Sequence, residues 1–343
     1  MDISLSIREI EYVLTVASEK SITKAAQKLY IAQPSLSQAI IKIESRLGIK
    51  LFNRKTGQIY PTSEGELFIK MGKRILQNVR SFDDDISSLS NLESGEVVIG
   101  IPYLFGSFVI PEIVKQFHER YPNIKIHLVE NNSQTLENKI QGGEVDLAIM
   151  ALPFQDKSIQ YEEIFSSRML LVVSKSAKLN KYAYDTGSSS PHKYFNLSNA
   201  AEEPFIVGVE GQRIRLITQL IFHRAGINPP ISLYSKNIET IRRMAVANLG
   251  LAILPEQYIF DNIRGYCKKG GCWMAGNSDA NYYYLPESED VPWVIVLAYS
   301  DKDCLSNAAK HFSQTVHDYC STELTIPTFY PSCQDDNKNS VQL

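Results

Sequence analysis

The chain has 343 residues and a formal net charge of −3, and 44% of its residues are hydrophobic. This length predicts two or three domains, and the composition is that of a globular protein. The sequence has no run of about 18 apolar residues, which excludes a membrane-spanning helix. Its first residues lack the basic start and apolar core of a signal peptide, so we expect a cytoplasmic protein without a membrane partner.

Charge is divided unevenly along the chain. Residues 1–62 carry nine Lys or Arg against five Asp or Glu, a net +4, and the remainder carries 26 against 33, a net −7. A small basic module on an acidic body is common where the module meets nucleic-acid phosphates. The pattern favours nucleic-acid binding but is weakly specific by itself.

The first fifty residues show three helical patterns. Apolar residues at three- and four-residue steps predict a helix from Ile7 to Ser18, and Ser21 offers an N-cap for a second helix. A break at Tyr30–Ala32 is followed by Pro34, which fits the first turn of a third helix that Gly48 can end. Two short helices joined by a tight turn predict a helix-turn-helix.

The third helix presents short polar side chains near its start, where a helix-turn-helix reaches base edges. Basic side chains and a threonine around it are candidates for phosphate contacts. The candidate DNA-binding residues are Thr23, Lys24, Lys28, Gln33, Pro34, Ser35, Ser37, Gln38, Lys42, Arg54 and Lys55, with Arg46 and Lys50 as further phosphate contacts. The residues alone leave open a second interpretation, a compact helical domain whose polar faces are only solvated.

From Ser63 onward a stripe of apolar residues recurs at steps close to 3.5 residues, a period typical of coiled coils. Its members are Phe68, Met71, Ile75, Val79, Phe82 and Ile86. We predict that this helix forms a homodimer seam; the alternative is a helix packed against its own body. The segment Asn91–Gly95 is the predicted hinge to the rest of the chain.

Beyond Gly95, strands and helices alternate. The predicted strands are Val97–Ile101, Ile124–Glu130, Val145–Met150, Met169–Val173, Phe205–Val209, Ile231–Tyr234, Ala252–Leu254 and Trp293–Tyr299. The predicted helices are Phe108–Arg120, Gln134–Gln141, Ile214–Ala225, Ile238–Ala247 and Ser306–Tyr319. This order predicts an α/β fold with parallel strands and right-handed crossovers, in which Met169 begins a second set and the last strand and helix return to the first.

Two segments of this region are predicted as loops. Asp185–Asn196 is rich in turn-forming residues and is expected to be an exposed loop, and Tyr282–Tyr284 is expected in another. The tail Thr325–Leu343 is polar and contains two prolines, which is typical of disorder.

The stretch SITKAAQKLYIAQPSLSQAIIKIESRLGIKLFNRKTGQIYPTSEGELF closely resembles the signature of LysR-type (LysR family) transcriptional regulators. The matching positions are Ser21, Ala25, Ala26, Leu29, Gln33, Pro34, Ser35, Ser37, Ile40, Glu44, Leu47, Gly48, Leu51, Phe52, Arg54, Thr62 and Gly65. The departures are Ile22 for Phe, Ala32 for Ser or Thr, and Ile43 for Leu. Ala32 removes a hydroxyl that would cap the third helix or touch a phosphate.

The resemblance continues to about residue 320 through YPNIKIHLVENNSQTLENKIQGGEVDLAIM and NIETIRRMAVANLGLAILPE. It implies an N-terminal winged helix-turn-helix at 1–62, with a wing at Lys50–Tyr60, and a long linker or dimerisation helix with its hinge at 63–94. It also implies an effector-binding domain of two α/β lobes at 95–322, similar to periplasmic binding proteins. Residues 323–343 would be a disordered tail.

In such two-lobed folds a ligand lies between the lobes, near helix N-termini at the ends of parallel strands. The candidate effector-binding residues are Pro102, Tyr103, Leu104, Asn132, Ser133, Gln212 and Asn237. Leu104 stands where relatives often carry a hydroxyl that helps to hold a carboxylate. We therefore expect a more apolar pocket, or a ligand without a carboxylate at that point.

The resemblance implies a sequence-specific DNA-binding transcriptional regulator whose DNA binding or activation is modulated by a small-molecule effector. The implied partners are double-stranded DNA with a near-palindromic operator, the effector, and further copies of the chain in a homodimer or homotetramer; RNA polymerase is an additional candidate. We expect no cofactor, no metal and no enzymatic activity, because the sequence has no G-x-S-x-G, Walker or HExxH motif.

Two other functions stay open. The first is a redox-sensing regulator on the same scaffold, using Cys267 and Cys272, although free thiols in a surface loop are the more common case. The second is a ligand-binding protein that does not read DNA.

Overall fold

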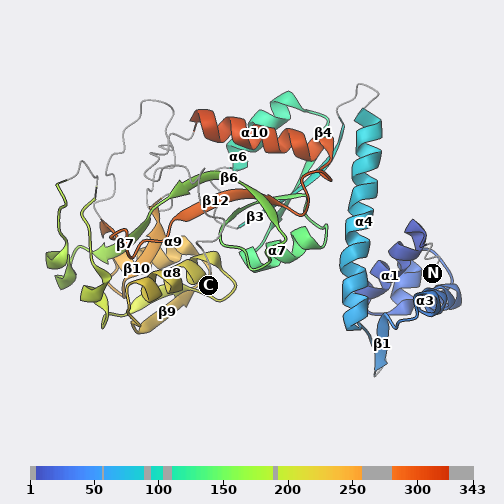
Figure 1. Ribbon diagram of the computed structural model, residues 1–343, viewed down its shortest axis with the longest axis horizontal. Helices are drawn as coiled ribbons and strands as arrows, with labels where there is room; N and C mark the ends of the chain where they lie inside the picture. The colour runs from blue at the N-terminus through green and yellow to red at the C-terminus, as the bar shows by residue number, and fades with distance from the viewer. Residues whose placement is uncertain are drawn as a thin grey trace.

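The computed structural model describes residues 5–55, 58–88, 94–102, 110–187, 192–256 and 280–323. These ranges contain an N-terminal helical domain, one long helix and two α/β lobes (Figure 1). The order of elements confirms the predicted class: a winged helix-turn-helix, a linker helix and a two-lobed α/β domain. The domain limits at residues 62, 94 and 322 stay predictions.

The three N-terminal helices begin at capping residues. Ser6 precedes α1 (Ile7–Glu19) and forms a reciprocal capping box with Glu9, and Ser21 caps α2 (Ile22–Lys28) through the backbone N–H of Lys24. The third helix, α3 (Gln33–Leu47), ends at Gly48, whose φ of +71° places it in the left-handed region that glycine favours. The predicted helices are confirmed to within one residue at their ends.

The core of this domain explains why the helices cross closely. Ala25 and Ala26 of α2 are buried against apolar residues of α1 and α3, and their small size lets the helices approach. Strand β1 (Phe52–Lys55) pairs antiparallel with β2 (Gln58–Pro61), which confirms the wing as a hairpin. Residues 56 and 57 at its predicted tip lie outside the described residues.

The linker helix α4 (Ser63–Ser88) begins as part of the N-terminal domain. A Cβ on Gly65 would collide with the carbonyl oxygen of Leu51, and one on Gly72 would lie 2.9 Å from the side chain of Ile10. The first turns of α4 therefore pack against the helix-turn-helix, while the rest of the helix extends along the first lobe (Figure 1).

The first lobe contains a five-stranded sheet in the order β4-β3-β5-β12-β6. Its strands are β3 (Gly95–Ile101), β4 (Ile124–Glu130), β5 (Leu147–Ala151), β6 (Gln160–Ser167) and β12 (Trp293–Tyr299). Strand β3 runs parallel to β4 and β5, whereas β12 is antiparallel to β5 and to β6. The predicted return of the last strand to the first lobe is confirmed, and the sheet is mixed rather than wholly parallel.

Helices cover both faces of this sheet. Helices α6 (Ile110–Arg120) and α10 (Asn307–Glu323) lie on one face, and α7 (Ser133–Gln141) lies on the other. Successive side chains of β5 point to opposite faces of the sheet. Leu147 and Ile149 therefore belong to the apolar cluster on one face, and Ala148 and Met150 to the cluster on the other. This arrangement sets the start of α7 at the end of β4.

The second lobe is built around β7 (Met169–Ser174), which pairs antiparallel with β10 (Ala252–Pro255) and β11 (Ala280–Tyr284). A parallel pair, β8 (Phe205–Gly208) and β9 (Ile231–Ser235), joins this sheet through a bridge between Phe205 and Leu251. Helices α8 (Arg213–Arg224) and α9 (Ile238–Val246) and the short turns η1 (Lys178–Tyr182) and η2 (Leu197–Ala200) complete the lobe.

Two expectations need correction, and one strand was not predicted. Residues Tyr282–Tyr284 belong to strand β11 and not to a loop, because they pair with β7. The segment Asp185–Asn196 is not wholly exposed: Tyr184 and Tyr194 form a bridge, and Phe195 is fully buried. Strand β6 was not predicted. The predicted tail lies outside the described residues, as does most of the hinge.

Candidate functional site

The recognition helix α3 has one buried and one exposed side. Leu36, Ile40 and Ile43 point into the domain core. Of the predicted DNA-binding residues on this helix, Gln33, Pro34, Ser35, Gln38 and Lys42 are exposed and Ser37 is half-buried. Ala32 occupies the N-cap without a side-chain hydrogen bond, as expected from the missing hydroxyl. The helix therefore presents a continuous polar side to solvent.

Glu44 connects the recognition helix to the wing. Its carboxylate is buried, and Oε1 accepts hydrogen bonds from the backbone N–H groups of Leu51 at 2.8 Å and Phe52 at 3.1 Å. Oε2 lies 3.1 Å from Nζ of Lys50. Glu44 was a position of the recognised signature, but its role in fixing the wing beside α3 becomes visible only in the structure.

The basic residues around α3 fall into two groups. Three of them are engaged in ion pairs: Lys28 with Glu19 at 2.7 Å, Arg46 with Glu9 at 2.7 Å, and Lys50 with Glu44. Lys24 and Lys42 are exposed and, within the part of the chain that the structure describes, form no ion pair. Thr23 is exposed beside Lys24, and the side chains of Arg54 and Lys55 lie outside the described residues.

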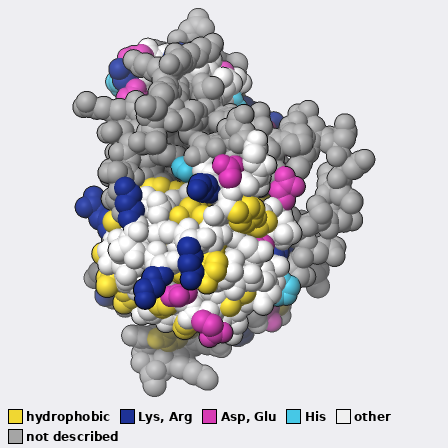
Figure 2. Space-filling view, turned by 90° about the vertical axis from the view of Figure 1, so that its left-hand side faces the viewer, with side chains coloured by type: hydrophobic (Ala, Val, Ile, Leu, Met, Phe, Trp, Pro, Cys, Tyr) yellow, Lys and Arg dark blue, Asp and Glu magenta, His cyan; other side chains and the backbone are white. Residues whose placement is uncertain are grey.

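Charge is distributed differently at the opposite end of the molecule. On the face of the second lobe in Figure 2, Lys and Arg side chains are interspersed with Asp and Glu among the residues drawn. Among the described residues on this face (Figure 2), positive and negative side chains alternate and form no continuous basic area.

The linker helix leaves apolar side chains uncovered. Met71, Ile75, Phe82 and Ile86 of the predicted seam are exposed, Val79 is half-buried, and Phe68 packs partly against the N-terminal core. Leu67, one residue earlier, is 63% exposed and extends the stripe in place of Phe68. An apolar stripe of this length on an exposed helix is typical of an association surface.

Four loops meet where the two lobes join. The N–H of Asn131 donates to the carbonyl of Ile101, which places the loop after β4 beside the loop after β3. The N–H of Gln134 lies 3.4 Å from the carbonyl oxygen of Gly211, so the start of α7 touches the start of α8. Nε2 of Gln212 donates to the carbonyl of Lys236 at 2.6 Å, which ties the start of α8 to that of α9.

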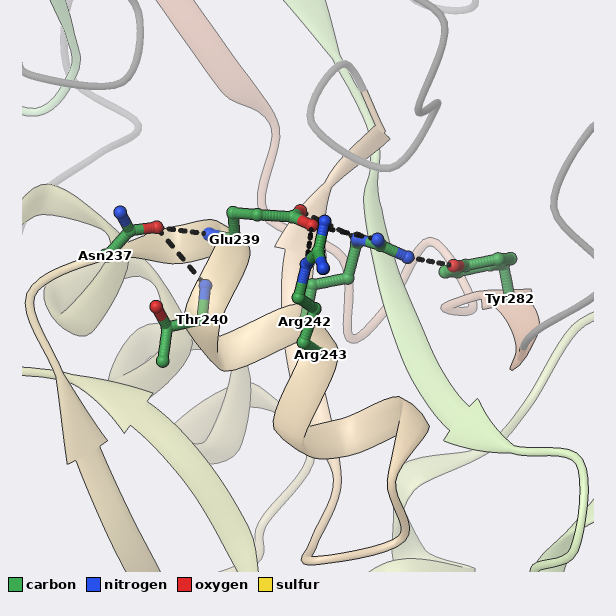
Figure 3. Close-up of polar contacts among 6 residues, drawn as sticks. All are labelled: Asn237, Glu239, Thr240, Arg242, Arg243 and Tyr282. Carbon is green, nitrogen blue, oxygen red and sulfur yellow. Dashed lines mark hydrogen bonds and ion pairs between the residues drawn. The ribbon is translucent and has the colours of Figure 1, made fainter.

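The predicted effector residues that the structure describes lie on these loops, and the side chains of Asn132, Gln212 and Asn237 serve local structure. Asn132 caps α7 through the N–H of Thr135, and Asn237 caps α9 through the N–H groups of Glu239 and Thr240 (Figure 3). Gln212 also accepts the N–H of Val209. Ser133 is buried and Pro102 is half-buried, while Tyr103 and Leu104 lie outside the described residues.

Sequence reasoning missed a buried ion pair at this junction. Glu137 of α7 and Arg213 of α8 are 1% and 6% exposed, and Nη2 of Arg213 donates to Oε1 of Glu137. Burial lowers the pKa of Arg213, and the adjacent carboxylate opposes this shift. Within the described residues, Nε of Arg213 has no hydrogen-bond partner. The available signal was a charged residue between Leu136 and Ile140 on the apolar side of a helix.

A second charged network organises α9. Arg242 is almost fully buried and donates to both carboxylate oxygens of Glu239, at 2.8 and 2.9 Å, and to the hydroxyl of Tyr282 at 3.1 Å (Figure 3). Arg243 also contacts Glu239. Burial raises the pKa of Glu239, but the hydrogen bonds from both arginines outweigh it and the pKa is lowered overall. This network fixes α9 against β11.

The interior of the second lobe holds a further cluster of charges. Arg168 pairs with Asp290 at 3.1 Å and stacks over the ring of Tyr284 at 4.3 Å. The hydroxyl of Tyr284 donates to Oε1 of Glu256 at 2.8 Å. Burial raises the pKa of Glu256, an effect that Arg168 partly opposes. The cluster joins three strands and is structural.

The described residues include two cysteines and no metal-binding cluster. No group of three or more His, Cys, Asp or Glu side chains in these residues is arranged to hold a metal ion. Cys304 and Cys320 are free thiols, and burial raises the pKa of Cys320 to about 12, which disfavours the thiolate form. Cys267 and Cys272 lie outside the described residues. None of the helices that the structure describes has the length and apolar character needed to cross a membrane.

Comparisons with known proteins agree with this arrangement. Residues 7–66 match the bacterial regulatory helix-turn-helix proteins of the lysR family, and residues 90–265 match the LysR substrate binding domain. An uncharacterized HTH-type transcriptional regulator of Bacillus subtilis (strain 168), YcgK, is 31% identical over 264 residues, covering 73% of this chain and 80% of the relative. The DNA-binding transcriptional dual regulator OxyR of Escherichia coli (strain K12) is 24% identical over 251 residues, covering 73% and 79%.

Solved structures show the same fold. Full-length OxyR from Pseudomonas aeruginosa, in a cysteine-to-aspartate variant, has a TM-score of 0.65 at 20% identity and covers 92% of this chain and 95% of its own. Full-length BenM has a TM-score of 0.52 at 22% identity, with 94% and 99% covered. In each case the likeness extends over the N-terminal domain, the linker helix and both lobes.

Proposed function

Because the chain belongs to the LysR family and is a DNA-binding transcriptional regulator with an effector-binding domain, we propose that the exposed side of α3 reads its operator. The observation that supports this most directly is the polar side of α3, where Gln33 and Ser35 stand in solvent opposite the buried Leu36. In a helix-turn-helix these first turns enter the major groove.

The proposed contacts divide into base reading and phosphate binding. Gln33, Ser35, Ser37 and Gln38 read bases, since Gln binds adenine through two hydrogen bonds and Ser adapts to several bases. Pro34 fixes the entry of the helix. Thr23, Lys24, Lys28, Lys42, Arg54 and Lys55 contact phosphates and set the register of the domain on the duplex.

A homodimer formed through α4 would place two such helices on a near-palindromic operator. The exposed stripe Leu67, Met71, Ile75, Phe82 and Ile86 supports this proposal, because it is apolar and uncovered. Two half-sites on one face of double-stranded DNA then match the two-fold axis of the protein. We also propose a homotetramer as the working form, RNA polymerase as a further partner, and the cytoplasm as the location.

The small-molecule effector is proposed to bind at the lobe junction, against Pro102, Tyr103, Leu104, Asn132, Ser133, Gln212 and Asn237. The contacts among the described loops support this, because the starts of α7, α8 and α9 meet there. Helix N-termini carry partial positive charge, which suits polar ligands. The ligand regulates by binding one arrangement of the lobes better than another. We expect no cofactor and no catalysis.

Selection of genomic DNA fragments by the purified full-length protein tests the proposed reading face. The wild type is expected to enrich fragments with an interrupted inverted repeat, and Gln33→Ala/Ser37→Ala to lose this enrichment while it retains weak, salt-sensitive binding. The matched control is Gln314→Ala/Ser313→Ala, which also changes one exposed Gln and one half-buried Ser on a helix, but in α10. Equal enrichment by both double variants would contradict the assignment of α3.

A further inference from the structure

The ion pair between Glu137 and Arg213 connects the two lobes directly. Glu137 lies on α7, which packs on the first-lobe sheet, and Arg213 is the first residue of α8, which packs against β8 in the second lobe. Both side chains are almost completely withdrawn from solvent. A buried carboxylate of this kind needs its partner, since ionised groups are poorly tolerated without one.

The second oxygen of Glu137 holds a different segment. Oε2 accepts hydrogen bonds from the backbone N–H groups of Gln155 at 2.9 Å and Asp156 at 3.3 Å. These residues follow β5 and have no regular secondary structure. One buried carboxylate therefore fixes both the start of α8 and the loop that contains Asp156.

Asp156 in turn reaches the linker helix. Its Oδ1 accepts the N–H and hydroxyl of Ser158, and its Oδ2 lies 3.7 Å from Nζ of Lys70 on α4. The hydrogen bonds from Ser158, and more weakly the charge of Lys70, lower the pKa of Asp156, so it is ionised at neutral pH. The interactions thus run from Arg213 through Glu137 and Asp156 to Lys70.

Neighbouring contacts keep α4 close to the first lobe at this point. Lys73 pairs with Glu144 at 2.6 Å, and Gln77 donates to Asp146 at 2.8 Å. Gly143 has a φ of +65°, and a Cβ there would lie 3.1 Å from the carbonyl oxygen of Lys73. The linker helix therefore rests on the turn that follows α7, the helix that carries Glu137.

We propose that Glu137 is a positioning residue that couples the lobe junction to the linker helix and, through it, to the DNA-binding domain. When Arg213 moves with the second lobe, the carboxylate of Glu137 shifts with its ion-pair partner, and the hydrogen bonds from Oε2 carry this shift to the loop at Gln155–Asp156 and so to the contact with Lys70. This rests on the proposed function in one respect, because it takes the lobe junction as the place where an effector acts.

Hydrogen–deuterium exchange of the full-length protein tests this coupling without any ligand. Glu137→Gln keeps the size of the side chain but replaces one carboxylate oxygen by an amide donor, which must face either Arg213 or the backbone N–H groups of Gln155 and Asp156. In either orientation one of the two contacts is lost, and the path from Arg213 to the loop at 155–156 is interrupted. The expected result is that amides of residues 66–79 in α4 exchange about threefold faster, the change expected for loss of one partly exposed ion pair. Faster exchange confined to α7 and residues 153–158 would overturn the proposal.

Two further variants make the result specific. Asp156→Ala removes the contact with Lys70 but leaves the pair of Glu137 and Arg213 intact. Amide exchange in α4 should therefore become faster, while exchange of residues 206–216 stays unchanged. Unchanged exchange in α4 would overturn the role of Asp156. Asp290→Asn is the matched control, because it also breaks a buried pair with an arginine, but inside the second lobe. If Asp290→Asn loosens α4 equally, the effect is general destabilisation and the coupling is refuted.

The same variants separate this inference from the proposed function. Binding to a selected genomic fragment, measured by fluorescence anisotropy, reports on the DNA-reading role of α3. If Glu137→Gln leaves the exchange of α4 unchanged while the wild type binds DNA, only the role of Glu137 is rejected. If the wild type does not bind DNA, the proposed reading face is rejected and the exchange result stays valid.

Discussion

The carboxylate of Glu44 on the recognition helix accepts the backbone N–H of Leu51 at the start of the wing, at 2.8 Å. The same oxygen accepts the N–H of Phe52, so the buried end of α3 holds the chain that leads into β1. Thr62 completes the connection, because its hydroxyl donates to the carbonyl of Lys50. The relative position of helix and wing, which a winged helix-turn-helix presents to DNA as a unit, therefore depends on the side chains of Glu44 and Thr62.

Glu44→Ala is expected to destabilise the N-terminal domain by about 2–4 kcal/mol, because two buried N–H groups lose their acceptor. Differential scanning calorimetry of the full-length protein should show the earliest transition at a lower temperature. The control is Glu66→Ala, an exposed glutamate in the first turns of α4, which should change the profile little. An unchanged transition in Glu44→Ala would show that water or another group satisfies these donors.

Ala32→Ser should stabilise the recognition helix. Ala32 stands at the N-cap of α3 and makes no side-chain hydrogen bond, whereas a serine hydroxyl can accept an N–H of the first turn. The expected gain is about 1 kcal/mol, seen as slower hydrogen exchange of the amides of Ser35 and Leu36. Ala32→Val, which adds bulk without an acceptor, should give no gain; equal protection in both variants would exclude capping as the cause.

Phe82→Ser should weaken self-association. Phe82 is 64% exposed and stands in the apolar stripe of α4, where burial in a dimer would contribute roughly 2 kcal/mol for each copy. Sedimentation velocity over a range of concentrations should show dissociation at a concentration at least about 100-fold higher than for the wild type. Phe68→Ser is an instructive comparison, because Phe68 packs partly on the N-terminal core and should lower domain stability instead.

Glu256→Gln is expected to change how stability depends on pH. Burial raises the pKa of Glu256 above its ordinary value of 4.5, so the folded protein favours the protonated, neutral form. A group whose folded pKa is raised contributes stability that is fully present below the unfolded pKa and is lost as pH rises through the folded pKa. Glutamine stays neutral at every pH and keeps an oxygen for the hydroxyl of Tyr284.

The measurement is urea unfolding of both proteins at pH 4.5 and pH 8. The difference in unfolding free energy between Glu256→Gln and the wild type should become more favourable to the variant as the pH rises. A difference that stays constant between the two pH values would show that Glu256 is ionised in both states, with Arg168 compensating its burial.

Much of the fold could be read from the sequence because local signals were strong. Ser21, Pro34 and Gly48 marked the limits of helices, and the signature fixed the order of the N-terminal elements. Strand β11 was missed because Tyr282–Tyr284 gains its structure from pairing with β7, a distant segment that no local pattern reveals. Phe195 was placed in an exposed loop for the same reason, since its burial depends on tertiary contacts.

The candidate sites divide in the same way. The exposed side of α3 followed from helical periodicity, because the burial of Leu36 and Ile40 determines which residues face solvent. The pair of Glu137 and Arg213 did not, although the place of Glu137 beside the buried Leu136 was a signal for its burial. The sequence does not show which arginine pairs with it, because Arg213 lies on the other lobe, and a charged residue is rarely buried without a partner.

The salt dependence of DNA binding should distinguish free from paired lysines. Each phosphate contact by a lysine releases a counterion, so removing one contact should reduce the slope of log K against log salt by about 0.9. Lys42→Ala and Lys24→Ala should each approach this value, because both side chains are exposed and form no ion pair among the described residues. Lys28→Ala should change the slope less than these two variants, because the ammonium group of Lys28 is shared between the phosphate and Glu19, which lies 2.7 Å away.

Fluorescence anisotropy with one selected operator fragment between about 50 and 200 mM salt gives the slopes, over a range where several phosphate contacts change affinity by orders of magnitude. Glu19→Gln supplies the decisive comparison, because it frees Lys28 without removing it. In that variant the slope should steepen, and adding Lys28→Ala should then remove close to one full contact. If Lys28→Ala has its full effect in the presence of Glu19, then the ion pair opens on DNA and Lys28 is as much a phosphate contact as Lys42.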